Sequence, residues 1–225
     1  MVKNNNDLVP DTRYVSKKKL ALVLFLTVAI FTFGLLVGNF LTVGKLNDIL
    51  SVDREARLQL ESIDLEEKLL SNIPCTDPAL LSSNLNDLGV KIAYLETEYD
   101  KDDPQILELK KPYTLLEIRH YLKLKEIVDS CGKNYTLVLF FYSNDLEKRD
   151  LSEQQGFVLE YLQKKYTPDK IKVYSFDADL DMDIMRSFKS IYGVQDVPGI
   201  VINGKTYTGF HDKSELESII TSNSN

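Results

Sequence analysis

The stretch "YGVQDVPGIVING", Tyr192 to Gly204, decides the fold that this sequence predicts. Its Asn203-Gly204 dipeptide is typical of a two-residue hairpin turn in which both residues have a positive φ. The turn divides "GIVINGKTYTG" into two short strands. The preceding residues, "DMDIMRSFKSIYG", form a helical pattern that ends at Gly193. The stretch therefore predicts a helix followed directly by an antiparallel hairpin.

Two more strands and a helix are predicted upstream of this stretch. The segments "TLVLFFYS" (136–143) and "IKVYSFDA" (171–178) are apolar on both faces, and the helical segment "LSEQQGFVLEYLQKKY" lies between them. Continuous apolar strands that alternate with helices predict a parallel pair covered on both sides. A last helix, "DKSELESII", follows the hairpin and has Asp212 or Ser214 as its cap.

The order β-α-β-α-β-β-α resembles the thioredoxin fold from Tyr135 to Ile220. In that family a Gly-Val pair ends the second core helix, a cis-proline opens the next strand and a tight turn follows. The matching positions are Gly193, Val194, Val197, Pro198, Asn203 and Gly204. The resemblance implies an α/β domain over residues 133–225 with a cis peptide bond at Pro198. It also implies that the backbone of Val197 and Pro198 pairs with extended peptide.

The sequence departs from the family at its catalytic position. Redox members carry Cys-x-x-Cys at the start of the helix after the first strand, where the helix N-terminus stabilises a thiolate. Here that position reads "SNDLEKRD", without cysteine or histidine. We therefore expect no catalytic residue and no cofactor, and a protein-binding or assembly role in which Ser143, Asn144, Lys148 and Arg149 line the surface beside the proline.

The chain has two cysteines, Cys75 and Cys131. Cys131 precedes the first strand, and eight strand residues of about 3.3 Å each separate it from the family's catalytic position by roughly 26 Å. A disulfide between Cys75 and Cys131 is the expected use in an oxidising compartment. Two buried free thiols and a redox-active pair stay open, and the last of these makes a thiol-disulfide oxidoreductase the alternative function.

The segment Leu20 to Gly44 carries no charged residue. Twenty-five residues at helical rise span roughly 37 Å, which exceeds the ~30 Å hydrocarbon core of a bilayer. We interpret it as an uncleaved signal anchor rather than a cleaved signal peptide or a buried core helix. The basic residues Arg13 and Lys17 to Lys19 place the tail 1–19 in the cytoplasm and the chain after Lys45 outside the cell membrane.

Two features of this region raise the question of self-association. Gly34 and Gly38 form a G-x-x-x-G pattern that allows two membrane helices to approach closely, so a homodimer is one hypothesis. Residues 45–73 predict a stalk helix with near-heptad apolar positions, interrupted by Asp53 and Glu67. A self-associating coiled coil, and with it a structural spacer as a third class of function, stays open.

Residues 74–132 predict a helical segment between the stalk and the α/β domain. One helix is expected to start at Asp77-Pro78, and a short one to start at Asp103-Pro104 and end by Pro112. Thr114 and Glu117 form a capping box for a third helix, from Leu115 to about Ser130, and Gly132 closes it.

Charge and spacing argue against two further kinds of partner. The net charge is −7, and residues 1–19 are basic, so the rest of the chain carries about −10, which disfavours nucleic acid. Alternate aspartates from Asp177 to Asp183 have the spacing of half a calcium loop, but Met182 and Phe188 occupy its glycine and glutamate positions. We therefore expect no metal site, and glycosylation of the Asn134 sequon stays open.

Overall fold

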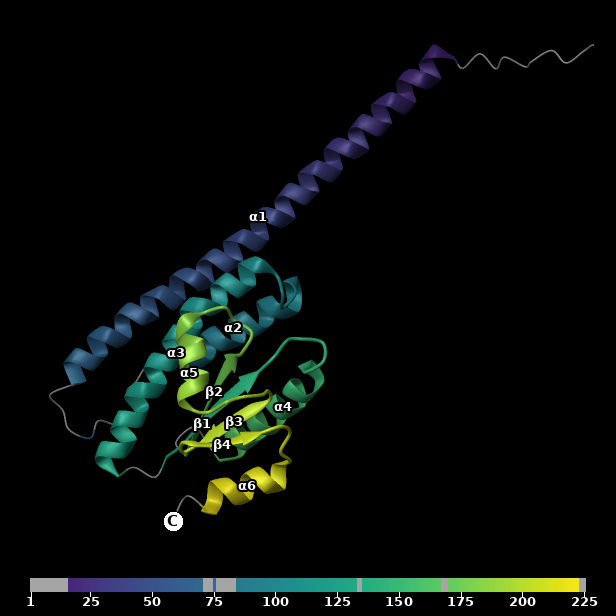
Figure 1. Cartoon of the computed structure of the whole chain (residues 1–225). Helices are drawn as coiled ribbons and strands as arrows, with labels where there is room; N and C mark the ends of the chain where they lie inside the picture. The colour runs from purple at the N-terminus through teal and green to yellow at the C-terminus, as the bar shows by residue number, and fades with distance from the viewer. Residues whose placement is uncertain (1–15, 71–74, 76–83, 133–134, 167–169, 223–225) are drawn as a thin grey trace, which may run out of the picture. The chain divides into compact units, whose positions relative to one another are not determined.

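The computed structural model describes residues 16–70, 75, 84–132, 135–166 and 170–222. It divides into two compact units, residues 1–48 and 49–225. Helix α1 (Lys17–Leu70) begins in the first unit and ends in the second (Figure 1). The span expected at 20–44 and residues 45–70 of the expected stalk thus lie in one continuous helix.

The first unit contributes an apolar helical segment whose large side chains are exposed. Phe25, Phe31 and Phe40 are each at least 66% exposed. The hydroxyls of Thr27, Thr32 and Thr42 donate to backbone carbonyls four residues earlier, so these polar groups are satisfied within the helix. By length and composition α1 could cross a membrane.

The second unit holds a four-stranded mixed sheet and the remaining helices. Strand β1 (Thr136–Tyr142) pairs in parallel with β2 (Ile171–Asp177) and antiparallel with β3 (Gly199–Ile202), which pairs antiparallel with β4 (Lys205–Thr208). The strand order is β2-β1-β3-β4. The parallel pair and the hairpin predicted from the sequence are confirmed, with Asn203 and Gly204 both at positive φ.

Two hydrophobic cores lie on opposite faces of this sheet. Alternate residues of β1 divide between them, because successive side chains of a strand point to opposite faces. Leu139 belongs to the core that includes α3 (Pro104–Cys131) and α5 (Asp183–Ile191). Phe140 belongs to the core that includes α4 (Arg149–Lys165) and α6 (Lys213–Ser222). The mixed α/β class is thus confirmed, with helices on both faces.

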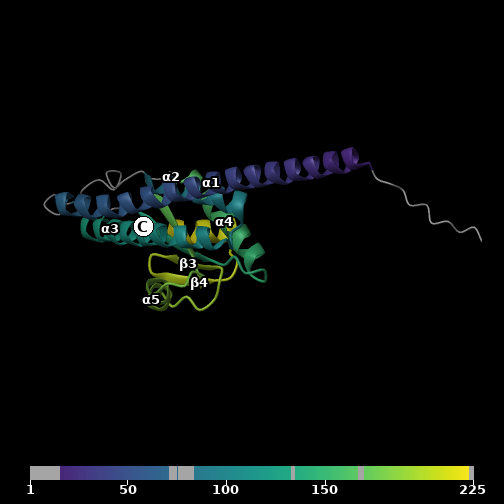
Figure 2. The ribbon, with the colours of Figure 1, turned by 90° about the horizontal axis from the view of Figure 1, so that it is seen from above.

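The end of α1 and helix α2 (Asn84–Tyr99) extend the first of these cores. The C-terminal part of α1 runs along α2 and α3 (Figures 1 and 2). Its buried stripe consists of Ile49, Val52, Ala56 and Ile63. The apolar side of the expected stalk therefore packs within its own chain. The helix start expected at Asp77-Pro78 lies outside the described residues.

The expected helix break at Pro112 is wrong. Helix α3 runs from Pro104 to Cys131 with Pro112 inside it. Leu109 and Leu116, on either side of the proline, are both fully buried, and that burial offsets the loss of one helical hydrogen bond. The ends are as predicted: Asp103 accepts from the Gln105 N–H at 2.8 Å, and Gly132 has a φ of 60°.

Candidate functional site

The candidate site lies where β1 ends and α4 begins, beside the turn that precedes β3. In the antiparallel register Phe141 pairs with Gly199. The residues after β1 therefore lie next to those before β3, which brings Ser143 near Val197. The Val197–Pro198 peptide bond is cis.

The polar turn after β1 is fixed by hydrogen bonds to Asp179. The Ser143 hydroxyl donates to Asp179 Oδ2 at 2.7 Å, and the Asn144 N–H donates to the same oxygen at 3.0 Å. The Ser143 N–H donates to the Ser152 hydroxyl at 3.1 Å. Ser143 is buried and fully engaged in this network, so it acts as a structural cap of the turn.

A second group of contacts covers the backbone beside the proline. Lys148 Nζ lies 2.6 Å from Asp196 Oδ1. The same oxygen accepts from the Val197 N–H at 2.9 Å. The hydrogen bond and charge of Lys148 lower the pKa of Asp196, and Asp196 raises the pKa of Lys148. The Val197 N–H beside the proline is thus held by the neighbouring carboxylate.

These groups surround a depression of about 200 Å³ that includes Ser143, Lys148 and Val197. Two other residues predicted for this surface are directed elsewhere. The Asn144 side chain donates to Asp177 at 3.2 Å, and the Arg149 guanidinium donates twice to the Asn144 carbonyl. Neither Asn144 nor Arg149 lines the depression.

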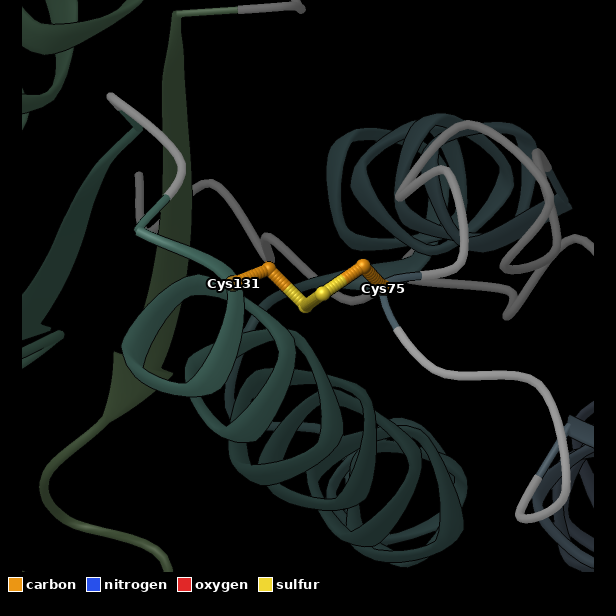
Figure 3. Close-up of a disulfide and its surroundings, with 2 residues drawn as sticks. All are labelled: Cys75 and Cys131. Atoms are coloured by element: carbon orange, nitrogen blue, oxygen red, sulfur yellow. A yellow bond between two sulfur atoms is a disulfide. The ribbon is translucent and has the colours of Figure 1, made fainter.

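The cysteines lie at the other end of β1. Cys75 and Cys131 form a disulfide with a Cα–Cα distance of 5.3 Å (Figure 3). Cys131 is the last residue of α3 and precedes β1, whereas the candidate site follows β1. The bond joins the end of α3 to the segment that follows α1.

A buried charge cluster lies on α3 and was missed by the sequence interpretation. Lys110 is 4% exposed and forms ion pairs with Asp177 and, at 2.7 Å, with Glu96 of α2. Seven residues later on the same helix, Glu117 is also buried. Lys110 and Glu117 lie two helical turns apart on the buried stripe of α3, and that placement is the signal that could have revealed both.

The capping box expected at Thr114 and Glu117 is wrong, because no helix begins there. Thr114 and Glu117 lie inside α3 and are buried at 3% and 4% exposure. Glu117 Oε1 accepts from the Ser175 N–H of β2 at 3.3 Å. Burial raises the pKa of Glu117 to about 8, although Ser175, Lys172 and Tyr113 favour its charged form.

The outer edge of β2 is satisfied by side chains of two helices. Glu117 of α3 accepts from the Ser175 N–H, and Gln163 of α4 accepts from the Val173 N–H at 3.0 Å.

The four aspartates with calcium-loop spacing have divided roles. Asp177 pairs with Lys110, and Asp179 holds the turn after β1. Asp181 and Asp183 both form ion pairs with Arg186. Within the described residues, no group of three metal-ligating side chains converges.

No protein-family model matches this chain, and no curated protein sequence matches it. Solved structures similar to it include chloroplastic thioredoxin z, at 19% identity and a TM-score of 0.34 over 45% of this chain and 87% of that one. Thioredoxin from Malassezia sympodialis matches at 24% identity and a TM-score of 0.33, over 45% of this chain and 85% of that one. A malarial protein matches at 21% identity and a TM-score of 0.32, over 40% of this chain and 97% of that one. Each similarity thus covers most of the solved chain and less than half of this one.

Proposed function

We propose that this chain is a single-pass membrane protein whose extracytoplasmic, thioredoxin-like domain binds extended peptide without redox chemistry. The observation that carries the proposal is the depression beside cis-Pro198, where Val197 borders polar groups and no sulfur. The position retains the backbone geometry for strand addition and lacks a thiol. The cysteines that could supply one are bonded to each other at the far end of β1.

The contact that covers Val197 is easily displaced. The Lys148 and Asp196 side chains are 44% and 58% exposed, and exposed ion pairs contribute little to stability. An incoming peptide carbonyl can therefore replace Asp196 Oδ1 as the acceptor for the Val197 N–H. Asp196 then acts as an internal competitor of the peptide.

The charges around the depression favour a basic residue in the peptide. Asp145, Asp179 and Asp196 line it together with Lys148 and Lys189. Lys189 donates to the Ala178 carbonyl at 3.1 Å and faces its own backbone. Three carboxylates against two lysines leave a net negative charge at the depression, which favours a lysine or arginine in the bound peptide.

A photo-crosslinking experiment on the full-length protein in its native membrane tests the proposal. A benzoylphenylalanine at Gln195, an exposed residue of the depression, is expected to capture a partner polypeptide. The same group at Gln154, exposed on α4 outside the depression, is the matched control. Equal capture at both positions, or capture at neither, contradicts peptide binding beside Val197.

Substitution of Asp196 gives a second, quantitative test. Asp196→Ala removes the competing acceptor and is expected to raise peptide affinity several-fold, whereas Asp196→Asn retains an acceptor and stays near the wild type. Asp181→Ala changes an exposed carboxylate away from the site and serves as the control. Peptide affinity that falls in Asp196→Ala would show that the carboxylate contacts the peptide directly.

Thiol-disulfide exchange is the second candidate, and one observation favours it. Cys75 is exposed, so a substrate thiol can reach the disulfide. Insulin reduction by the full-length protein discriminates between the two functions. Turnover that is abolished by Cys131→Ser supports the oxidoreductase, and a stable disulfide without turnover supports peptide binding.

A further inference from the structure

A separate cavity of about 560 Å³ lies along the outer edge of β2, away from the candidate peptide site. Its walls come from α2, α3, α4 and the two parallel strands. Its apolar lining includes Val90, Ile92, Ala93, Leu159 and Val173. Its polar lining includes the charge cluster of Glu96, Lys110, Glu117 and Asp177, together with Tyr113 and Tyr142. The cavity therefore combines apolar surface with a charge cluster.

The charge cluster holds one buried carboxyl oxygen without a donor. Glu117 is 4% exposed, and its Oε2 has no hydrogen-bond partner among the described residues. Glu96 Oε1 lies 2.7 Å from Lys110 Nζ and is engaged in that ion pair. A buried carboxyl oxygen without a donor is unfavourable. Glu117 Oε2 is therefore suited to a donor that a ligand supplies.

The charges select the sign of that ligand. Lys110 is shared between Asp177 and Glu96, and its Nζ also lies 5.5 Å from the centre of the Tyr142 ring. Lys164, the other lysine of the wall, is 2.5 Å from Glu160. An anion would thus compete with existing ion pairs. Lys172, which lies near Glu117, donates to Asn86 at 2.7 Å. A cation would therefore meet the Glu117 carboxyl group and the Tyr113 and Tyr142 rings of the lining.

We propose that this cavity binds a small organic molecule through a protonated primary amine, which donates to Glu117 and Glu96 while an apolar portion contacts Val90, Ala93 and Leu159. This function is independent of peptide binding beside Pro198, because the two cavities share no lining residue. A primary amine offers three donors: one for Glu117 Oε2, one for Glu96 beside its ion pair with Lys110, and one for a tyrosine hydroxyl.

Amine binding is coupled to the protonation of Glu117. Burial raises its pKa to about 8, so the empty cavity holds a neutral carboxyl at pH 7. A bound ammonium group stabilises the carboxylate and releases a proton to the buffer. The ionisable groups around Glu117 are Glu96 of α2, Lys110 and Tyr113 of α3, Tyr142 of β1, Lys172 and Tyr174 of β2, and Glu160 and Lys164 of α4.

Calorimetry on the full-length protein in nanodiscs tests the site with three probes of equal length: n-butylamine, n-butanol and n-butyrate. Butylamine is expected to bind at least tenfold more tightly than either of the others, after subtraction of empty nanodiscs. Its binding is also expected to release protons at pH 7, measured as a difference in binding heat between phosphate and MOPS buffers, neither of which is a primary amine. Equal binding of the three probes, tighter butyrate binding or no binding of any probe overturns the proposal.

Two variants connect the binding to the cavity. Glu117→Gln keeps the shape of the side chain and is expected to abolish both the amine preference and the proton release. Glu108→Gln, on the exposed side of the same helix, is the matched control and should change neither. Ala93→Leu narrows the cavity from an exposed position and should weaken butylamine binding at least fivefold. Unchanged binding in both Glu117→Gln and Ala93→Leu overturns the assignment.

The ammonium group that binds here belongs either to a free amine or to a lysine side chain of a polypeptide. One more probe separates these two cases. Nα-acetyl-lysine N-methylamide carries the lysyl amine on a blocked backbone. Tighter binding than butylamine assigns the site to lysine in a polypeptide, and weaker binding assigns it to a free amine. Either result retains the ammonium-carboxyl chemistry.

Discussion

Lys110 and Asp177, 67 positions apart in the chain, form a buried ion pair that joins the middle of α3 to the end of β2. The contact links the helical segment to the sheet through a pair of which neither side chain is more than 5% exposed. Glu96 shares the lysine, so one cation neutralises two carboxylates from different elements. The pair therefore connects α2, α3 and the sheet at one point.

Loss of this cation is expected to be strongly destabilising. Lys110→Met keeps the length of the side chain but leaves Asp177 and Glu96 without a counter-charge. Removal of one partner from a buried pair costs about 3–5 kcal/mol. Urea unfolding of the full-length protein in detergent, followed by near-ultraviolet circular dichroism, measures the change. Lys111→Met, next to it but more exposed, should stay within about 0.5 kcal/mol of the wild type.

The pH dependence of stability should reveal Glu117. Its folded pKa of about 8 exceeds the unfolded value of 4.5, so the folded protein binds the extra proton between these values. Unfolding free energy therefore falls as the pH rises from 4.5 to 8 and is level above that range. Glu117→Gln removes this contribution, so the variant should gain a few kcal/mol relative to the wild type between pH 5 and 8.5. A difference that does not change with pH contradicts the raised pKa.

The disulfide should contribute to stability rather than to chemistry. Cys75 and Cys131 close a loop with a sequence separation of 56 residues, and the chain-entropy treatment assigns about 4 kcal/mol to such a loop. The double variant Cys75→Ser, Cys131→Ser should lose about 4 kcal/mol of unfolding free energy and therefore unfold at lower urea concentration. A reducing agent should lower the stability of the wild type and leave the variant unchanged.

Membrane anchoring predicts how the chain fractionates and which part a protease reaches. The full-length protein should stay with membranes after alkaline carbonate extraction, because its apolar segment in α1 is long enough to span them. Protease added outside intact cells should digest residues 49–225, whereas the membrane should protect the span. Replacement of Lys17, Lys18 and Lys19 by glutamate should invert part of the population. Complete extraction by carbonate contradicts the anchor.

Self-association through the G-x-x-x-G pattern has its own variant. A Cβ placed at Gly34 or Gly38 meets no atom within 4 Å in the single chain, so Gly34→Leu should be tolerated by the monomer. If two chains pack at these glycines, the larger side chain separates their backbones and abolishes the dimer. Cross-linking in membranes measures the effect. Gly44→Leu, also in open space but outside the pattern, should leave the dimer intact.

The strands and the hairpin could be predicted because their signals are local. A short apolar run marks each of β1 and β2, and the Asn203-Gly204 dipeptide marks the turn between β3 and β4. The structure confirms the parallel pair and the hairpin. Pro112 misled the interpretation, since a proline is a local signal and the burial of Leu109 and Leu116 is not. Whether a helix continues through proline is decided by packing that the sequence does not state.

The candidate sites could be predicted only in part. Ser143, Lys148 and Val197 come together because strand register places the end of β1 beside the start of β3. The orientation of the Arg149 side chain depends on its hydrogen bond to the Asn144 carbonyl. The hydrogen bond from the Val197 N–H to Asp196 depends on the rotamer of Asp196. The sequence gives neither. The cavity proposed to bind an amine joins five elements, and no short stretch of sequence contains its pattern.

The side chains that satisfy the outer edge of β2 have a consequence for how copies of this protein behave at high concentration. Val173 and Ser175 would otherwise present open N–H donors to any passing strand. An unprotected edge is a template for aggregation, strand by strand, between neighbouring molecules. Gln163 and Glu117 occupy both donors, so a strand of another molecule finds neither N–H group open at the outer edge of β2.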